Sequence, residues 1–153
     1  MWNHAQAPRP ADALASRQLY GITLEDADGH AQSLSQWRGK ILVVNFWATW
    51  CAPCVAEMPD LDKLQQEYSE RNVAIIGIGI ENRDRVRQFR DRLGLRMTLL
   101  AGGFDSLGLA RSFGDDQGVL PYTALLSADG RLLKAHAGAL GAGQLRQWLD
   151  ATQ

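Results

Sequence analysis

The amino-acid sequence predicts an α/β domain, in which a mixed β-sheet is covered by helices on both faces. Two apolar, β-branched runs, "KILVVNFW" and "NVAIIGIGI", are typical of central strands buried on both sides. Each run is followed by a segment with helical periodicity. This alternation of strands and helices favours a sheet with helices on both of its faces.

The first half of the chain begins with a hairpin in "YGITLEDADGHAQSL", which turns at Asp28-Gly29. A short turn or helix in "SQWRG" leads into the first buried strand, residues 40–47. A long helix is expected from Cys51 to about Glu70, because apolar residues recur there at helical spacing. The second buried strand, residues 72–80, follows this helix.

The second half adds a further helix between strands and then a closing β-β-α unit. An arginine-rich amphipathic helix is expected from Asn82 or Arg83 to Leu93, with Val86, Phe89 and Leu93 on one face. After it the sequence predicts a short strand in "RMTLLAG" and a helix over Asp105–Phe113, which Gly114 ends. A hairpin of "YTALLS" and "RLLKAHA" then turns at Asp129-Gly130, and a last helix covers Gly141–Ala151.

Length and composition indicate one domain. The chain has 153 residues, enough for a substantial core. Residues 1–17 are expected to form a linker or disordered segment and residues 18–153 the folded domain, which we expect to be a monomer. A net charge of −1 gives no reason to expect a nucleic-acid partner.

The search for targeting signals does not decide the cellular compartment. The longest apolar runs fall short of the about 20 residues that a membrane span needs. Met1–Arg9 contains no apolar segment of the kind found in a secretory signal. We therefore expect either a cytoplasmic protein or one whose leader or membrane anchor has been removed.

The most informative feature is the Cys51-Ala52-Pro53-Cys54 sequence, which contains both cysteines of the chain. A zinc site normally needs four ligands, and there is no second pair of cysteines. Covalent haem attachment needs a histidine after the second cysteine, where this chain has Val55. A structural disulfide that closes so small a loop would remove little chain entropy.

A redox-active pair explains the position of the two cysteines better than these alternatives do. Cys51 lies where a buried strand ends and a helix begins, so that unpaired N–H groups and the helix dipole would stabilise its thiolate. We expect Cys51 to be the attacking sulfur and Cys54 to resolve the mixed disulfide. No other cofactor or metal is expected.

The segment "NFWATWCAPC" resembles the active-site motif of the thioredoxin superfamily. The matching residues are Phe46, Trp47, Trp50, Cys51, Pro53 and Cys54. Pro59 matches a helix-kinking proline of that superfamily. "VLPYTALL" resembles its cis-proline segment, which would make Leu120-Pro121 the cis bond.

Within the superfamily, "VNFWATWCAPCVAEMPDL" is most similar to the TlpA/ResA-like branch of thiol-disulfide oxidoreductases. The amino-terminal hairpin and the extra helix after "AIIGIGI" also resemble that branch more than thioredoxin itself. The resemblance implies a thioredoxin-like fold and a protein-disulfide reductase in the periplasm, free or tethered to the membrane. It further implies a membrane electron donor and disulfide-containing partner proteins, for example in cytochrome c maturation. Trp50, Pro53, Leu120 and Pro121 would contact the substrate, which could pair with the backbone of Leu120 as an added strand.

Glu57 is the third candidate catalytic residue. Thioredoxins carry a buried aspartate before the Phe-Trp pair, whereas this chain has Asn45, which does not titrate near neutral pH. At 100° per residue, Glu57 falls near the middle of the apolar stripe of its helix and one turn from Cys54. A carboxyl group buried there would have a raised pKa and could exchange protons with Cys54. The alternative is a first-turn glutamate that only favours the helix dipole.

Two other function classes remain open at this point. One is an oxidase, isomerase or peroxidase, although the absence of a histidine between the cysteines favours a reductant. The other is a non-catalytic copper or haem chaperone that uses the cysteines as soft ligands. Glu81, which ends the second buried strand, could lie near the site because ligands gather at the carboxyl ends of strands.

Overall fold

The computed structural model describes residues 10–153, which form a seven-stranded mixed sheet and five α-helices. The strands are β1 (Thr23–Asp26), β2 (Ala31–Ser33), β3 (Ile41–Trp47), β4 (Val73–Gly79), β5 (Thr98–Ala101), β6 (Tyr122–Leu126) and β7 (Leu132–Ala137). The helices are α1 (Pro10–Tyr20), α2 (Ala52–Tyr68), α3 (Arg83–Leu93), α4 (Ser106–Ser112) and α5 (Ala142–Asp150), with a 3₁₀ turn, η2, at Leu34–Trp37.

The strand order across the sheet is β2-β1-β5-β4-β3-β6-β7. Strands β3, β4 and β5 are parallel, so their carboxyl ends meet at one edge of the sheet. Strand β6 is antiparallel to β3 and starts at that same edge, with Tyr122 opposite Phe46. Four connecting segments therefore converge there, after β3, β4 and β5 and before β6.

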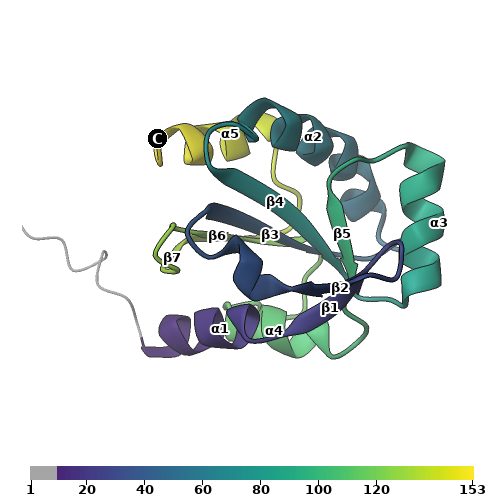
Figure 1. Ribbon diagram of the computed structural model, residues 1–153, viewed down its shortest axis with the longest axis horizontal. Helices are drawn as coiled ribbons and strands as arrows, with labels where there is room; N and C mark the ends of the chain where they lie inside the picture. The colour runs from purple at the N-terminus through teal and green to yellow at the C-terminus, as the bar shows by residue number, and fades with distance from the viewer. Residues whose placement is uncertain (1–9) are drawn as a thin grey trace, which may run out of the picture.

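Helices cover both faces of this sheet, as the sequence predicts (Figure 1). Helices α2, α3 and α5 pack on one face through Met58, Phe89 and Leu149, around Trp47 of β3. Helices α1 and α4 cover the opposite face, where Leu19 and Ala110 join a second buried cluster. Every residue of β3 and β4 is buried, because the side chains on each face of the sheet pack against a layer of helices.

The expectation for the amino-terminal segment is wrong from residue 10 onward. Residues 10–17 belong to α1 and not to a linker, while residues 1–9 lie outside the described part of the chain. Ala15 and Leu19 are fully buried against the sheet, and Ser16 Oγ donates a 2.6 Å hydrogen bond to the Gly130 carbonyl oxygen. The buried residues of the described helix, Ala15, Ser16, Leu19 and Tyr20, include only two large apolar side chains, so that the sequence of this segment reads as polar.

The remaining elements agree with the sequence analysis within a few residues. Both hairpins turn where expected, and the extra helix α3 lies between β4 and β5. Val86 and Phe89 are buried on the inner face of α3, whereas Leu93 is partly exposed at its end.

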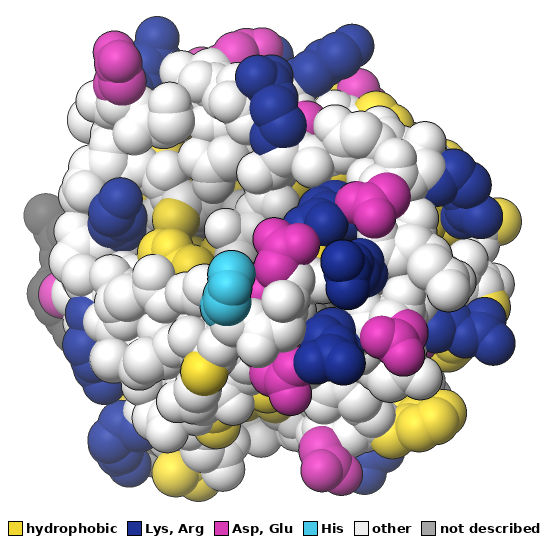
Figure 2. All heavy atoms as spheres, turned by 45° about the vertical axis from the view of Figure 1, so that its right-hand side comes forward, with side chains coloured by type: hydrophobic (Ala, Val, Ile, Leu, Met, Phe, Trp, Pro, Cys, Tyr) yellow, Lys and Arg dark blue, Asp and Glu magenta, His cyan; other side chains and the backbone are white. Residues whose placement is uncertain are grey.

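The outer face of α3 carries interleaved charges. Arg83 pairs with Glu25 at 3.0 Å and Arg90 with Asp28 at 2.9 Å, which links α3 to the β1–β2 hairpin. Figure 2 shows basic and acidic side chains alternating on one face of the molecule, without a large patch of either sign.

Candidate functional site

The two cysteines form a disulfide at the amino-terminal end of α2. Cys51 is the N-cap residue, with an extended backbone that directs its sulfur back toward the first turn. The backbone N–H of Cys54 points at Cys51 Sγ from 3.4 Å. After reduction, a thiolate at Cys51 would meet this N–H and the positive end of the helix dipole, both of which lower a thiol pKa.

Accessibility distinguishes the two sulfurs. Cys51 keeps 8% of its surface exposed, whereas Cys54 has none. Of the two cysteines, only Cys51 therefore keeps surface on which the sulfur of another protein can approach. Trp50, beside it, is 65% exposed, and Pro53 occupies the first turn of α2.

Leu120-Pro121 lies against the disulfide. Its peptide bond is cis, as the resemblance implies, and Cys51 Sγ lies 3.6 Å from the Leu120 carbonyl oxygen. The segment before it is held by Asp115, whose Oδ1 accepts a 2.9 Å hydrogen bond from the Val119 N–H. Burial raises the pKa of the Asp115 carboxyl above its ordinary value.

Glu57 lies one turn below Cys54 on α2 and is 8% exposed, which confirms that it does not sit on the polar face of the helix. Its Oε1 accepts a 2.7 Å hydrogen bond from the side-chain amide of Asn45 on β3. Its Oε2 accepts a 3.0 Å hydrogen bond from the backbone N–H of Leu140, in the segment between β7 and α5. The carboxyl group thus joins three parts of the fold directly beneath the disulfide.

Burial raises the pKa of the Glu57 carboxyl above its ordinary value. The hydrogen bonds from Leu140 and Asn45 oppose this rise because they favour the carboxylate, and the nearby His136 acts in the same direction. The net effect is a carboxyl group that keeps its proton to higher pH than an exposed glutamate does.

Asn45 has a structural role that its sequence position does not show. Its amide nitrogen donates both to Glu57 and, at 3.1 Å, to Thr123 Oγ1 on β6. Among the described residues, its Oδ1 has no hydrogen-bond partner although it is buried. The amide that replaces the thioredoxin aspartate thus orients the glutamate.

Glu81 reaches the site through Thr49. Its carboxylate accepts hydrogen bonds from both the backbone N–H and the hydroxyl of Thr49, two residues before Cys51. Glu81 thereby fixes the loop that leads into the cysteines, and within residues 10–153 its carboxylate hydrogen-bonds to Thr49 and to neither sulfur. Asp115, Thr123 and Leu140 were not identified from the sequence, since they reach the site only through the turns of the fold.

The described residues contain no group of three or more histidine, cysteine, aspartate or glutamate side chains arranged to hold a metal ion. Within residues 10–153, no helix is both long and apolar enough to cross a membrane.

A helix-capping cysteine pair next to a cis-prolyl segment, on a sheet with this strand order, defines a thiol-disulfide oxidoreductase with a thioredoxin-like fold. Comparisons with known proteins agree. The chain belongs to the redoxin family, whose model matches residues 10–147, and it is a ResA-like member of the thioredoxin superfamily.

Two relatives illustrate the similarity. The chain is 32% identical to the thiol-disulfide oxidoreductase ResA of Halalkalibacterium halodurans, over 90% of this chain and 77% of that protein. It is 31% identical to the thioredoxin-like protein YneN of Bacillus subtilis, over 88% of this chain and 78% of that protein.

Solved structures share the fold. A thiol:disulfide interchange protein from Chlorobium tepidum TLS matches with a TM-score of 0.77 and 22% identity, covering 86% of this chain and 92% of the other. MTB dsbF matches with a TM-score of 0.75 and 22% identity, covering 91% and 98%.

The raised pKa of Glu57 predicts a pH dependence of stability. Between the ordinary glutamate pKa of about 4.3 and the raised value, the folded protein binds the proton more tightly than the unfolded chain. The contribution of Glu57 to the free energy of unfolding should therefore fall as pH rises through this window and should change no further above it. Because glutamine does not titrate, Glu57→Gln should lack this component, as measured by urea unfolding of the oxidised proteins at a series of pH values.

Glu70→Gln serves as the control, since Glu70 is an exposed carboxylate just beyond α2. Its stability curve should follow that of the wild type. Parallel curves for wild type and Glu57→Gln would contradict the raised pKa.

Proposed function

We propose that this protein reduces disulfides in extracytoplasmic partner proteins, with Cys51 as nucleophile, Cys54 as resolving thiol and Glu57 as proton acceptor. The observation that carries the proposal is the difference between the two sulfurs. Cys51 keeps a small exposed surface, caps a helix and faces the Leu120 carbonyl, whereas Cys54 is fully buried one turn above a buried carboxyl group.

The reaction has two exchanges. The Cys51 thiolate attacks one sulfur of the partner disulfide, forming a mixed disulfide and releasing the other partner sulfur as a thiolate. The Cys54 sulfur then attacks Cys51, which forms the Cys51–Cys54 disulfide and releases the second partner sulfur. Two electrons pass to the partner, and the protein is left oxidised.

Glu57 would act in the second exchange. A buried Cys54 thiol must lose its proton before it can attack, and Glu57 is the titratable side chain on the turn of α2 beneath it. The carboxylate accepts that proton, and the hydrogen bonds from Asn45 and Leu140 keep it oriented. Trp50, Pro53, Leu120 and Pro121 would form the surface on which the partner lies.

The sequence between the cysteines supports the reducing direction, and the family resemblance supports the cellular setting. No histidine lies between the cysteines to stabilise the reduced form and make the pair a strong oxidant. The resemblance to the TlpA/ResA-like branch supports a periplasmic or membrane-tethered setting, a membrane electron donor and partners such as apocytochromes that await haem. No cofactor beyond the disulfide is proposed, and the protein would act as a monomer.

Cys54→Ser should trap the first exchange. Without the resolving thiol, reduced protein should accumulate as a mixed disulfide through Cys51 when it is mixed with a disulfide-bonded peptide. Non-reducing electrophoresis and mass spectrometry would locate the adduct. The matched Cys51→Ser variant should form little adduct, because Cys54 is buried, and equal trapping by the two variants would contradict the assignment of the nucleophile.

Glu57→Gln should slow the second exchange. When reduced wild type reacts with 5,5′-dithiobis(2-nitrobenzoate), the release of the second thionitrobenzoate reports the attack of Cys54 on the Cys51 adduct. In stopped-flow measurements this rate should rise with pH through the pKa of Glu57. The variant should be on the order of 10²-fold slower at neutral pH and should recover only toward the ordinary thiol pKa of about 8.5.

Glu70→Gln should retain the wild-type profile in the same measurement. A Glu57→Gln profile that coincides with that of the wild type would return Glu57 to a purely structural role.

The reduction potential of the Cys51–Cys54 couple tests the direction of electron flow. Equilibration against glutathione or dithiothreitol buffers should give a value near or below that of thioredoxin, about −270 mV. A value near about −120 mV would identify an oxidant instead. Failure to form the disulfide would favour the copper-chaperone alternative.

A further inference from the structure

Phe104 is the most exposed large apolar side chain of the described residues, at 75%. It lies in the loop between β5 and α4, which is firmly tied by its backbone. The Gly102 N–H donates to the Gly79 carbonyl at 2.8 Å, and the Leu107 N–H donates to the Phe104 carbonyl at 3.0 Å. The aromatic ring is therefore held in solvent by an ordered loop, which is typical of an interaction site.

Hydrogen bonds through Glu81 connect this loop to Thr49, in the segment that leads into the cysteines. The Gly103 N–H donates to the Glu81 carbonyl oxygen at 3.1 Å, and the Glu81 carboxylate binds Thr49, which precedes Trp50. Phe104 and Trp50 thus lie at the two ends of this hydrogen-bonded connection, at the edge where β3, β4 and β5 end. Val119, 38% exposed beside Leu120, adds a third apolar residue to this edge.

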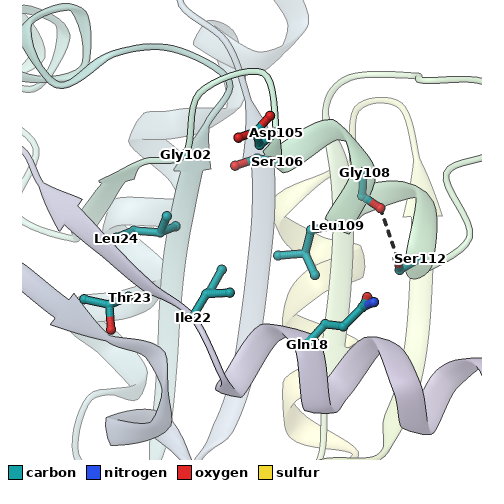
Figure 3. Close-up of a pocket in the computed structure, with 10 residues that line it drawn as sticks. All are labelled: Gln18, Ile22, Thr23, Leu24, Gly102, Asp105, Ser106, Gly108, Leu109 and Ser112. Atoms are coloured by element: carbon teal, nitrogen blue, oxygen red, sulfur yellow. Dashed lines mark hydrogen bonds between the residues drawn. The ribbon is translucent and has the colours of Figure 1, made fainter.

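Two hollows lie further along this edge, on the side of Glu81 away from the cysteines. The first, of about 390 Å³, is lined by residues 81–83, 101–103 and 23–25. The second, of about 610 Å³, shares Thr23, Leu24 and Gly102 with it and extends between α1 and α4. Figure 3 shows Ile22, Leu24 and Leu109 converging on this second hollow, with Asp105 and Ser106 at one end.

The hollows exist because strand pairing stops early. Strand β1 pairs with β2 from Thr23 onward but with β5 only at Glu25 and Asp26, since the chain leaves the sheet at Gly102. A side chain on Gly102 would collide with Ser106 and Ile78, so the chain can turn away here only with glycine. The result is an elongated, partly apolar groove that begins next to the active-site loop.

We propose that Phe104 and this groove bind an extended, apolar polypeptide segment that flanks the disulfide of a protein substrate. The inference rests on the proposed function and adds a specificity-determining surface to it. Any partner disulfide must lie on Cys51, so a chain that continues from it along the strand ends meets Phe104 and then the groove. A small disulfide contacts Cys51 and its immediate neighbours only.

Phe104→Ser tests the surface directly. Two disulfide-bonded peptides serve as probes, identical except that the residues beside one cysteine are leucine and phenylalanine in the first and serine in the second. Wild type should reduce the apolar peptide with a kcat/KM about 5- to 30-fold higher, the range expected for loss of an exposed aromatic anchor. Phe104→Ser should lose this preference while exchange with 5,5′-dithiobis(2-nitrobenzoate) stays unchanged.

Leu133→Ser is the matched control, because Leu133 is an exposed leucine on β7 at the opposite edge of the sheet. It should keep the wild-type preference. Thr23→Trp is a second test, since Thr23 is exposed and shared by the two hollows, and a bulky side chain there should slow only the apolar peptide.

The outcomes separate this inference from the proposed function. A wild type that reduces both peptides equally, or a Phe104→Ser variant that keeps the preference, overturns the inference alone. A wild type that reduces the small disulfide but neither peptide overturns both. A concentration-dependent dimer in sedimentation that Phe104→Ser abolishes would assign this face to self-association and would also overturn the inference.

Discussion

The buried carboxyl group of Glu57 is the constraint on which the site depends. An ionisable group in a core is costly unless its oxygens are hydrogen-bonded. Here one oxygen accepts from Asn45 on β3 and the other from Leu140 before α5, so the cost of burial is offset only when helix, central strand and carboxy-terminal segment are all in place. These contacts tie α2 to β3 and to the segment before α5, while the helix itself sets Cys54 one turn above the carboxyl group.

The parallel strands β3, β4 and β5 provide the second constraint, because they bring unrelated loops to one edge. The cysteines follow β3, Glu81 follows β4, Phe104 follows β5, and the cis-prolyl segment precedes β6. Polar side chains connect these loops sideways: Glu81 binds Thr49, and Asp115 holds Val119. The reacting sulfur is thus presented on a surface made of four segments, so substrate recognition can change in one loop without disturbing the chemistry in another.

Much of the site was predictable because it is local in sequence. The spacing of Cys51 and Cys54, the helix that begins between them and the position of Glu57 within the apolar stripe all follow from helical periodicity. The superfamily resemblance added Pro121, which no periodicity would identify. Asn45 illustrates the limit: the sequence indicates that it cannot replace a titrating aspartate, yet its contacts with Glu57 and Thr123 join residues 12 and 78 positions away. Helix α1 shows a different limit, because its few buried residues lie among polar ones and carry too weak a pattern to distinguish a packed helix from a polar linker.

The sequence by itself determined the fold class, the redox pair and the identity of the one carboxyl group beneath it, since each depends on residues within a few turns of one another. Only the tertiary structure decided which sulfur is accessible, which donors hold Glu57 and which loops border Cys51. These properties arise from strand order and from where each strand ends. The same physical reason applies to the groove beside Phe104, which exists because antiparallel β1 begins two residues beyond the point where β5 ends, a relation that no local pattern in either segment contains.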